Sequence, residues 1–172
     1  LRYKGLIHER IGRMYQEFED LGNSLTHYTK SMEYRTLFVE RDPANFNAIR
    51  DEAVSHENLS KTFVHLNDLE NARKHLLKAF DIYKWQHESD PVNVLAKISY
   101  AISYIHLGDI SHHAEWNSFK DTNSAKSYFL QSQGLLESAL EADTTNIRTR
   151  NLLNLVNRRL TWIESQLQSS EG

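Results

Sequence analysis

The fold is decided by a stretch that occurs twice, as HERIGRMYQEFEDLGNSLTHYTKSMEYRTLFVERDPAN (8–45) and as HENLSKTFVHLNDLENARKHLLKAFDIYKWQHESDPVN (56–93). Aligned at an offset of 48 residues, the two copies share 11 identities over 38 positions. The identities include the opening His-Glu pair and the closing Asp-Pro-X-Asn, so they cover the whole length of the copy. We conclude that the chain is built from an internal repeat.

A third copy is interrupted by an insertion. HLND (65–68) recurs as HLGD (106–109) at an offset of 41, whereas Ala72 matches Ala125 at an offset of 53. The 12-residue difference falls in SHHAEWNSFKDTNS (111–124), whose polar composition predicts a lengthened loop. The closing motif of this copy is DTTN (143–146).

Each copy predicts two helices. In the second copy Leu59, Phe63 and Leu66 recur at spacings of four and three, a turn follows at 67–68, and helical spacing resumes from Leu69. A turn this short makes the two helices antiparallel. The Asp-Pro pair then ends the second helix and begins the next. One apolar stripe in 147–168 predicts a last helix that caps the repeats.

The repeat resembles the tetratricopeptide repeat, which places small and aromatic residues at set positions of its two helices. In this sequence those positions are His8, Ile11, Gly12, Tyr15, Ser24, Tyr28 and Ser31, then His56, Leu59, Ser60, Phe63, Ala72, Leu76 and Ala79, then Lys97, Tyr100, Ala101, Tyr104, Ala125, Phe129 and Ser132. The resemblance implies an all-α fold, an α-α superhelix. We expect a single domain over 1–172, with repeats at about 4–43, 44–91 and 92–144 and a capping helix at about 147–168.

The period of 48 is longer than the 34 residues usual in that family. The excess divides equally between the two helices of a repeat and adds nearly two turns to each, which preserves the buried face of both. This long period is similar to that of extended arrays in large bacterial proteins, including arrays appended to serine/threonine protein kinases. The similarity implies that the chain is a segment of a larger multidomain protein.

Composition excludes several functions. The formal net charge is −3 and no long basic block occurs, so nucleic acid is not an expected partner. No run approaches the length of about 18 apolar residues that a membrane span needs, so no membrane insertion is expected. There is no Cys, which excludes disulfides and thiolate ligands. Composition does not fix the compartment, and a cytoplasmic location is favoured.

The nine His residues do not predict a metal site or an enzyme. A zinc-binding HExxH helix needs a second His four residues after the first, but Gly12 and Ser60 follow His8 and His56 at that spacing. Both His residues stand where the family places a bulky packing residue. No glycine-rich phosphate loop or nucleophile elbow occurs. We therefore expect no catalytic residue, no cofactor and no bound metal.

The resemblance implies a groove lined by the first helix of each repeat. It assigns to this groove Glu9, Arg13, Gln16, Glu57, Asn58, Lys61, His65, Ile98, Ile102, Ile105 and His106. The clamp with which some family members hold chaperone tails is absent, because only Asn58 matches it. The Ile residues predict either an apolar stripe open to a partner or a surface covered by the insertion, through Trp116 or Phe119.

The expected function is therefore that of a non-catalytic scaffold that binds a protein or peptide. The alternative is a self-association module, a homo-oligomer that stacks end to end and buries Leu1 and Leu6 of the first helix.

Overall fold

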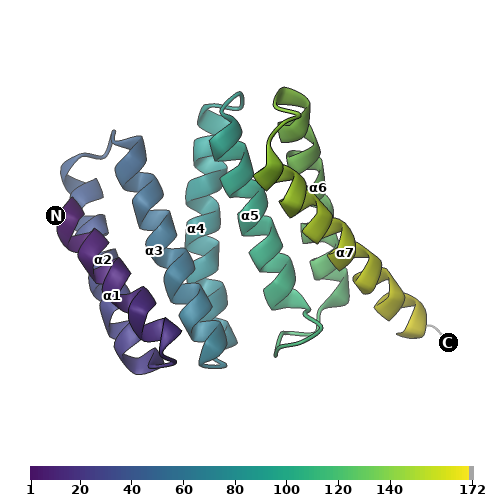
Figure 1. Cartoon of the computed structure of the whole chain (residues 1–172), viewed down its shortest axis with the longest axis horizontal. Helices are drawn as coiled ribbons and strands as arrows, with labels where there is room; N and C mark the ends of the chain where they lie inside the picture. The colour runs from purple at the N-terminus through teal and green to yellow at the C-terminus, as the bar shows by residue number, and fades with distance from the viewer. Residues whose placement is uncertain (171–172) are drawn as a thin grey trace. The chain divides into compact units, whose positions relative to one another are not determined.

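The computed structural model describes residues 1–170, which form seven α-helices and no strand (Figure 1). The helices are α1 (Arg2–Glu17), α2 (Leu21–Arg41), α3 (Phe46–His65), α4 (Leu69–Ser89), α5 (Val94–Ser111), α6 (Thr122–Ala142) and α7 (Ile147–Ser170). Successive helices pack on one another as hairpins, for example α1 on α2 and α5 on α6. The predicted all-α class, with three helix pairs and a terminal helix, is confirmed.

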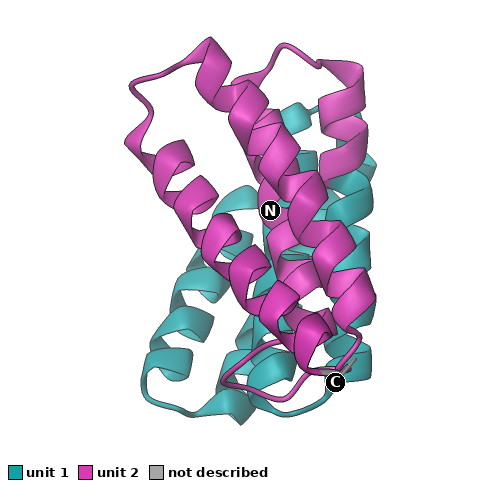
Figure 2. Cartoon of the chain, turned by 90° about the vertical axis from the view of Figure 1, so that its right-hand side faces the viewer, with its two compact units in different colours: residues 1–82 teal, residues 83–172 magenta. Residues whose placement is uncertain are grey.

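The contacts divide the chain into two compact units (Figure 2). Unit 1 is Leu1–Ile82, and unit 2 begins at Tyr83. The boundary falls inside α4, so unit 1 holds α1, α2, α3 and most of α4, and unit 2 holds the end of α4 with α5, α6 and α7. A single domain over 1–172 stays a prediction.

The turn between the two helices of a repeat is built in the same way in all three predicted repeats. Its αL residue is Glu19, Asn67 or Lys120, each with a φ of 60°. The next residue is an Asp whose carboxylate accepts the backbone N–H three positions later, an N-cap interaction. These bonds are Asn23 N to Asp20 Oδ1 at 3.1 Å, Asn71 N to Asp68 Oδ1 at 3.1 Å, and Ser124 N to Asp121 Oδ1 at 3.0 Å. The recurring Asp thus fixes where α2, α4 and α6 begin.

The turn between repeats also recurs. Asn45, Asn93 and Asn146 close the Asp-Pro-X-Asn and DTTN motifs, and each cap accepts the backbone N–H three residues later. These N–H groups belong to Ala48, Ala96 and Thr149, at 3.1, 3.1 and 3.0 Å from the Asn oxygens. The Asn is therefore the start signal of α3, α5 and α7, and the Pro that precedes it in two copies is not essential.

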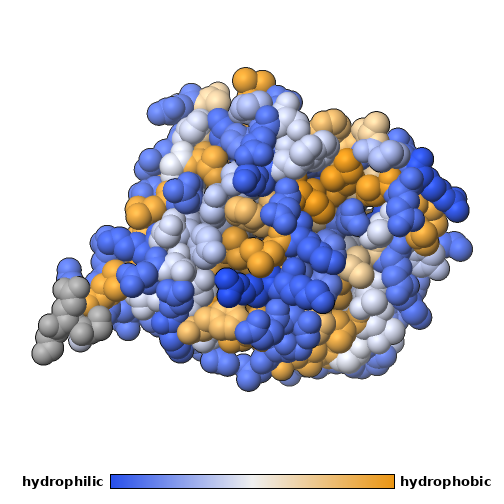
Figure 3. Space-filling view, turned by 180° about the vertical axis from the view of Figure 1, so that it is seen from behind, coloured by the Kyte–Doolittle hydropathy of each residue, from blue (hydrophilic) through white to orange (hydrophobic). Residues whose placement is uncertain are grey.

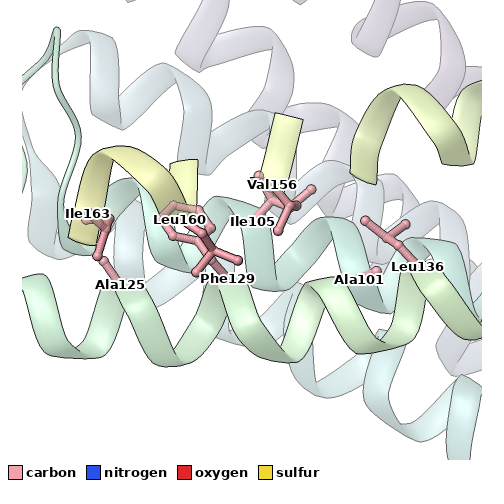
Figure 4. Close-up of a cluster of buried hydrophobic side chains, with 8 residues drawn as sticks. All are labelled: Ala101, Ile105, Ala125, Phe129, Leu136, Val156, Leu160 and Ile163. Carbon is pink, nitrogen blue, oxygen red and sulfur yellow. The ribbon is translucent and has the colours of Figure 1, made fainter. Parts of the chain in front are cut away.

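The core of unit 2 lies between α5, α6 and α7 (Figure 4). Fully buried Phe129 of α6 packs there with Ala101 of α5 and with Val156 and Ile163 of α7. The α7 residues come from the apolar stripe of the predicted capping helix. Helix α7 thus covers the face of the α5–α6 hairpin that would otherwise expose Phe129.

Gly108 of α5 makes room for Phe129. A Cβ at position 108 would lie 2.5 Å from Phe129 Cε1, well inside van der Waals contact. We expect Gly108→Ala to lower the free energy of unfolding by about 2 kcal/mol, because the overpacking cost exceeds the gain of about 1 kcal/mol in helix propensity. Urea unfolding followed by Trp fluorescence measures this change, since all three Trp residues lie in unit 2.

Gly134 of α6 provides the matched control. No atom lies within 4 Å of a Cβ built there, and the residue is exposed. Gly134→Ala should therefore stabilise the protein by up to about 1 kcal/mol. If both substitutions stabilise the chain, the close packing of Gly108 on Phe129 is wrong.

The helices of residues 1–170 are not membrane spans, since none of them combines sufficient length with sufficient hydropathy. On the face drawn in Figure 3 apolar residues are interspersed with hydrophilic ones.

Candidate partner-binding groove

A hollow of ≈ 650 Å³ lies in unit 1 against α1 and α3. Four of the residues assigned to the groove from sequence line it: Arg13 and Gln16 from α1, with Asn58 and His65 from α3. The volume lies in the range of about 300–1,000 Å³ typical of ligand sites. The structure therefore brings the first-helix positions of two successive repeats to one concave surface.

Four further residues line the hollow: Glu17, Glu19, Leu21 and Tyr28. Tyr28 was assigned to packing, which its 2% exposure supports. Its hydroxyl nevertheless donates to Gln16 Oε1 at 3.1 Å and so reaches the floor of the groove. Gly12 allows this position, because a Cβ there would lie 2.9 Å from Tyr28 Cδ1. The combination of Gly12 with Tyr28 in the first copy is the sequence signal that could have placed the Tyr28 hydroxyl at the groove.

Glu9 occupies a different environment from the other groove candidates. Its carboxylate is 7% exposed and forms ion pairs with Arg35 of α2 and with Arg13 Nη2, the latter at 2.7 Å. The buried Arg35 also donates to the Asp51 carbonyl at 2.8 Å and to Ser55 Oγ at 3.0 Å. Glu9 of α1 is therefore connected through Arg35 to α2 and α3, and its second ion pair holds Arg13.

The remaining candidates in α3 lie on the same helix face as the hollow but do not line it. Lys61 is exposed and Glu57 is half-buried. By contrast, the side chain of Asn58 faces the hollow, with no hydrogen bond to another described residue. The amides of Asn58 and Gln16 are suited to pairing with the backbone of a peptide, because each offers a donor and an acceptor.

Two of the candidates in α5 are buried. Ile98 and Ile105 are each 3% exposed, and Ile105 belongs to the core cluster of unit 2 with Phe129 (Figure 4). Both are therefore unavailable to a partner in this conformation. Ile102 and His106 are half-buried. Ile105 is covered because α6 and α7 pack on α5 at this position.

The insertion packs at the end of α5. Its backbone is held there by hydrogen bonds from Phe119 N to Ile110 O at 3.0 Å and from Asp121 N to Ser111 O at 2.9 Å. The buried His113 accepts the Glu115 N–H on Nδ1, and its Nε2 lies 3.8 Å from Asp109 Oδ1. Trp116 packs against the His113 ring and is 40% exposed.

A buried charge cluster connects this insertion to α7. Arg159 Nε lies 3.1 Å from Asp109 Oδ1. Burial raises the pKa of Asp109 to about 6, although the Arg159 guanidinium opposes the shift. Burial also lowers the pKa of His113 to about 4, with Arg159 contributing. The contacts of the insertion thus point to α5 and α7, and none of those observed involves Ile98 or Ile102.

Both predicted packing His residues form pairs that the sequence did not reveal. His8 Nδ1 lies 3.1 Å from His27 Nδ1, and His56 Nδ1 lies 3.0 Å from His75 Nδ1. Each pair joins the two helices of its repeat. The identities at 27 and 75 in the two copies were the signal that could have found them. Among the described residues no set of three or more His, Asp or Glu side chains is arranged to hold a metal ion.

Comparisons with known proteins identify no family for the chain. No protein-family model matches it, and no curated protein matches it. Among solved structures it is similar to the one titled "First TPR of Spaghetti (RPAP3) bound to HSP90 peptide SRMEEVD", with a TM-score of 0.45 and 15% identity over 94% of this chain and 96% of that chain.

Proposed function

We propose that the chain is a non-catalytic scaffold whose unit 1 binds a protein segment in the groove between α1 and α3. The observation that carries the proposal is the hollow of ≈ 650 Å³ to which both helices contribute polar side chains. Arg13 and His65 supply donors to it, and Asn58 supplies a side-chain amide that has no hydrogen bond to another described residue. Such a surface fits an extended peptide held through its backbone.

The groove chemistry also indicates which peptides fit. Glu17 and Glu19 line one side, whereas Arg13 is already paired with Glu9. The net charge available to a partner is therefore negative. A peptide that carries Lys or Arg near the Glu side and small or apolar residues elsewhere would complement this surface, because opposite charges guide the encounter and fix the register.

Peptides selected from a random library against the chain test this proposal. We expect Asn58→Ala combined with His65→Ala to weaken binding of the selected peptides about tenfold, because loss of one or two hydrogen bonds costs about 1–2 kcal/mol. Fluorescence polarisation with the labelled peptides measures the change. The variant should unfold at the wild-type temperature, since neither side chain forms a hydrogen bond or ion pair with another of the residues that the structure describes.

The matched control is Asn154→Ala in α7, an exposed Asn outside the groove. It should bind the same peptides as tightly as the wild type. Selected peptides whose affinity is equal for the groove variant, the control and the wild type would place the binding surface elsewhere and refute the proposal.

A further inference from the structure

Helix α1 and its C-cap residue Phe18 carry exposed apolar side chains on the side away from α2. Tyr3 is 81% exposed, Ile7 56%, Met14 45% and Phe18 76%. At about 100° per residue these four lie within about 60° of arc. They lie roughly opposite Gly12, which packs against Tyr28 of α2. We call these four residues the α1 stripe. The groove face of α1 carries Arg13, Gln16 and Glu17, and it adjoins the stripe at Glu17.

At the corresponding positions of α3, where the preceding helix pair packs, the side chains are short and buried. Ser55 and Thr62 stand 48 residues after Ile7 and Met14, and they are 1% and 0% exposed. Ser55 is in contact with α2, whose Arg35 donates to its hydroxyl. The same positions of the later helices are Ala96 and Ser103 in α5 and Thr149 and Val156 in α7.

The central positions of the α1 stripe are larger than any of these. Close packing of a second helix of the repeat type requires short side chains there, and the bulky Ile7 and Met14 would overpack such a contact. Four large exposed apolar side chains on one side of a helix also form a patch of the kind that marks interaction sites. The stripe is therefore suited to a different helix contact, one that accommodates bulky residues.

The spacing of the four stripe residues indicates which helix would fit such a contact. Tyr3, Ile7, Met14 and Phe18 are separated by four, seven and four residues, an order that reads the same in both directions. An antiparallel second copy of α1 therefore places an apolar residue opposite each apolar residue. Self-complementarity of this kind is what a two-fold interface requires.

The charges at the two ends of α1 favour the same direction. Lys4 lies near its beginning and Glu17 near its end, and both are exposed. In the antiparallel arrangement Lys4 of one copy lies at the level of Glu17 of the other, whereas a parallel arrangement sets like charges side by side. Arg10 lies halfway along the stripe and about 20° outside its arc, where its aliphatic stem can cover apolar surface while the guanidinium reaches water.

We infer that the α1 stripe is a dimerisation surface, on which α1 of a second copy packs antiparallel with Ile7 against Met14 and Tyr3 against Phe18. The sequence-based alternative placed Leu1 and Leu6 in such a contact, and both are only partly exposed. The helix is about 24 Å long, so the interface is small and the dimer belongs to the weak class. Dimerisation leaves Arg13 and Gln16 of the α1–α3 groove uncovered, whereas Glu17 lines the groove and also lies at the edge of the dimer contact.

Sedimentation velocity over a concentration series tests the dimer. We expect the wild-type chain to pass from monomer to dimer at micromolar concentration. Ile7→Ser with Met14→Thr gives α1 the residues of α3 and should raise the dissociation constant at least tenfold while leaving the circular dichroism spectrum unchanged. The control Leu37→Ser with Leu130→Ser removes apolar side chains of similar exposure elsewhere and should leave the dimer intact. A wild-type chain that stays monomeric at every concentration overturns the proposal.

Disulfide trapping tests the direction, and the absence of Cys from the chain makes it clean. Mixed Ile7→Cys and Met14→Cys chains should form a crosslinked dimer under mild oxidation. Each variant alone should not, because positions 7 and 14 of one helix are about 10 Å apart along the axis and like positions of the two copies are separated by that offset. Efficient crosslinking of either variant with itself, but not of the mixture, would overturn the antiparallel arrangement.

Discussion

Arg35→Met is expected to lower the free energy of unfolding by about 4 kcal/mol, the loss typical when one partner of a buried ion pair is removed. Arg35 is 6% exposed and pairs with the Glu9 carboxylate, which is itself 7% exposed. The substitution leaves that carboxylate with Arg13 alone. It also removes the donors to the Asp51 carbonyl and to Ser55 Oγ, so α1, α2 and α3 lose a common contact.

Hydrogen exchange and urea unfolding measure this effect. Amide protection should fall in peptides from α1, α2 and α3, and it should change little in α5 and α6, which belong to unit 2. Arg41→Met, at the exposed last turn of α2, is the matched control and should change stability by less than about 0.5 kcal/mol.

A second substitution distinguishes the buried charge from simple loss of packing. In the background of Arg35→Met, the change Glu9→Leu should recover at least half of the lost stability, because it removes the unpaired carboxylate. If the double variant instead loses the sum of the stability losses of the two single variants, Glu9 is solvated and the ion pair contributes little.

The helices could be predicted from the sequence, but the Arg35 network could not. The offset of 48 residues located the helices, since an Asp or Asn at the start of each helix is a local signal that each copy repeats. The partner of Glu9 has no such signal, because Arg35 is 26 residues away and its counterpart in the second copy is Tyr83. An alignment assigns Glu9 to a helix face and cannot assign its burial.

The lining of the proposed groove was predictable to the same extent, and its role in binding stays a prediction. Arg13, Gln16, Asn58 and His65 were placed on it by their positions in the first helices, and they line one hollow. Ile105 was placed on it by the same rule but packs in the core of unit 2. The difference depends on how closely the next helix approaches, which is decided by side-chain volumes at several positions together and not by the periodicity of one helix.

Acidification is expected to destabilise unit 1 through the buried His56, by about 3 kcal/mol between pH 6.5 and pH 4. Burial lowers the pKa of His56 from 6.5 to about 4, with His75 and Lys78 contributing in the same direction. The folded state therefore keeps this His neutral, and the unfolded state binds the proton more readily. Stability is fully present above pH 6.5 and is lost as the pH falls toward 4.

Burial is the main reason that the folded state resists a charge on His56, and the contact with His75 adds to it. The two Nδ1 atoms are 3.0 Å apart, so one ring donates and the other accepts while at least one is neutral. A second proton would place two like charges at that distance in a buried site. Burial also lowers the pKa of His75. Both His residues therefore favour the neutral form in the folded state, and both contribute to the loss of stability at low pH.

The measurement is the difference in urea unfolding free energy between the wild type and His56→Gln from pH 7.5 to pH 4. Taking the difference cancels Asp109, whose raised pKa of about 6 acts in the opposite sense because its burial costs least when it is protonated. The wild type should lose about 3 kcal/mol relative to the variant over this range. Parallel curves for the two proteins would mean that His56 takes up its proton in the folded state as readily as in the unfolded one, which is incompatible with its burial against His75.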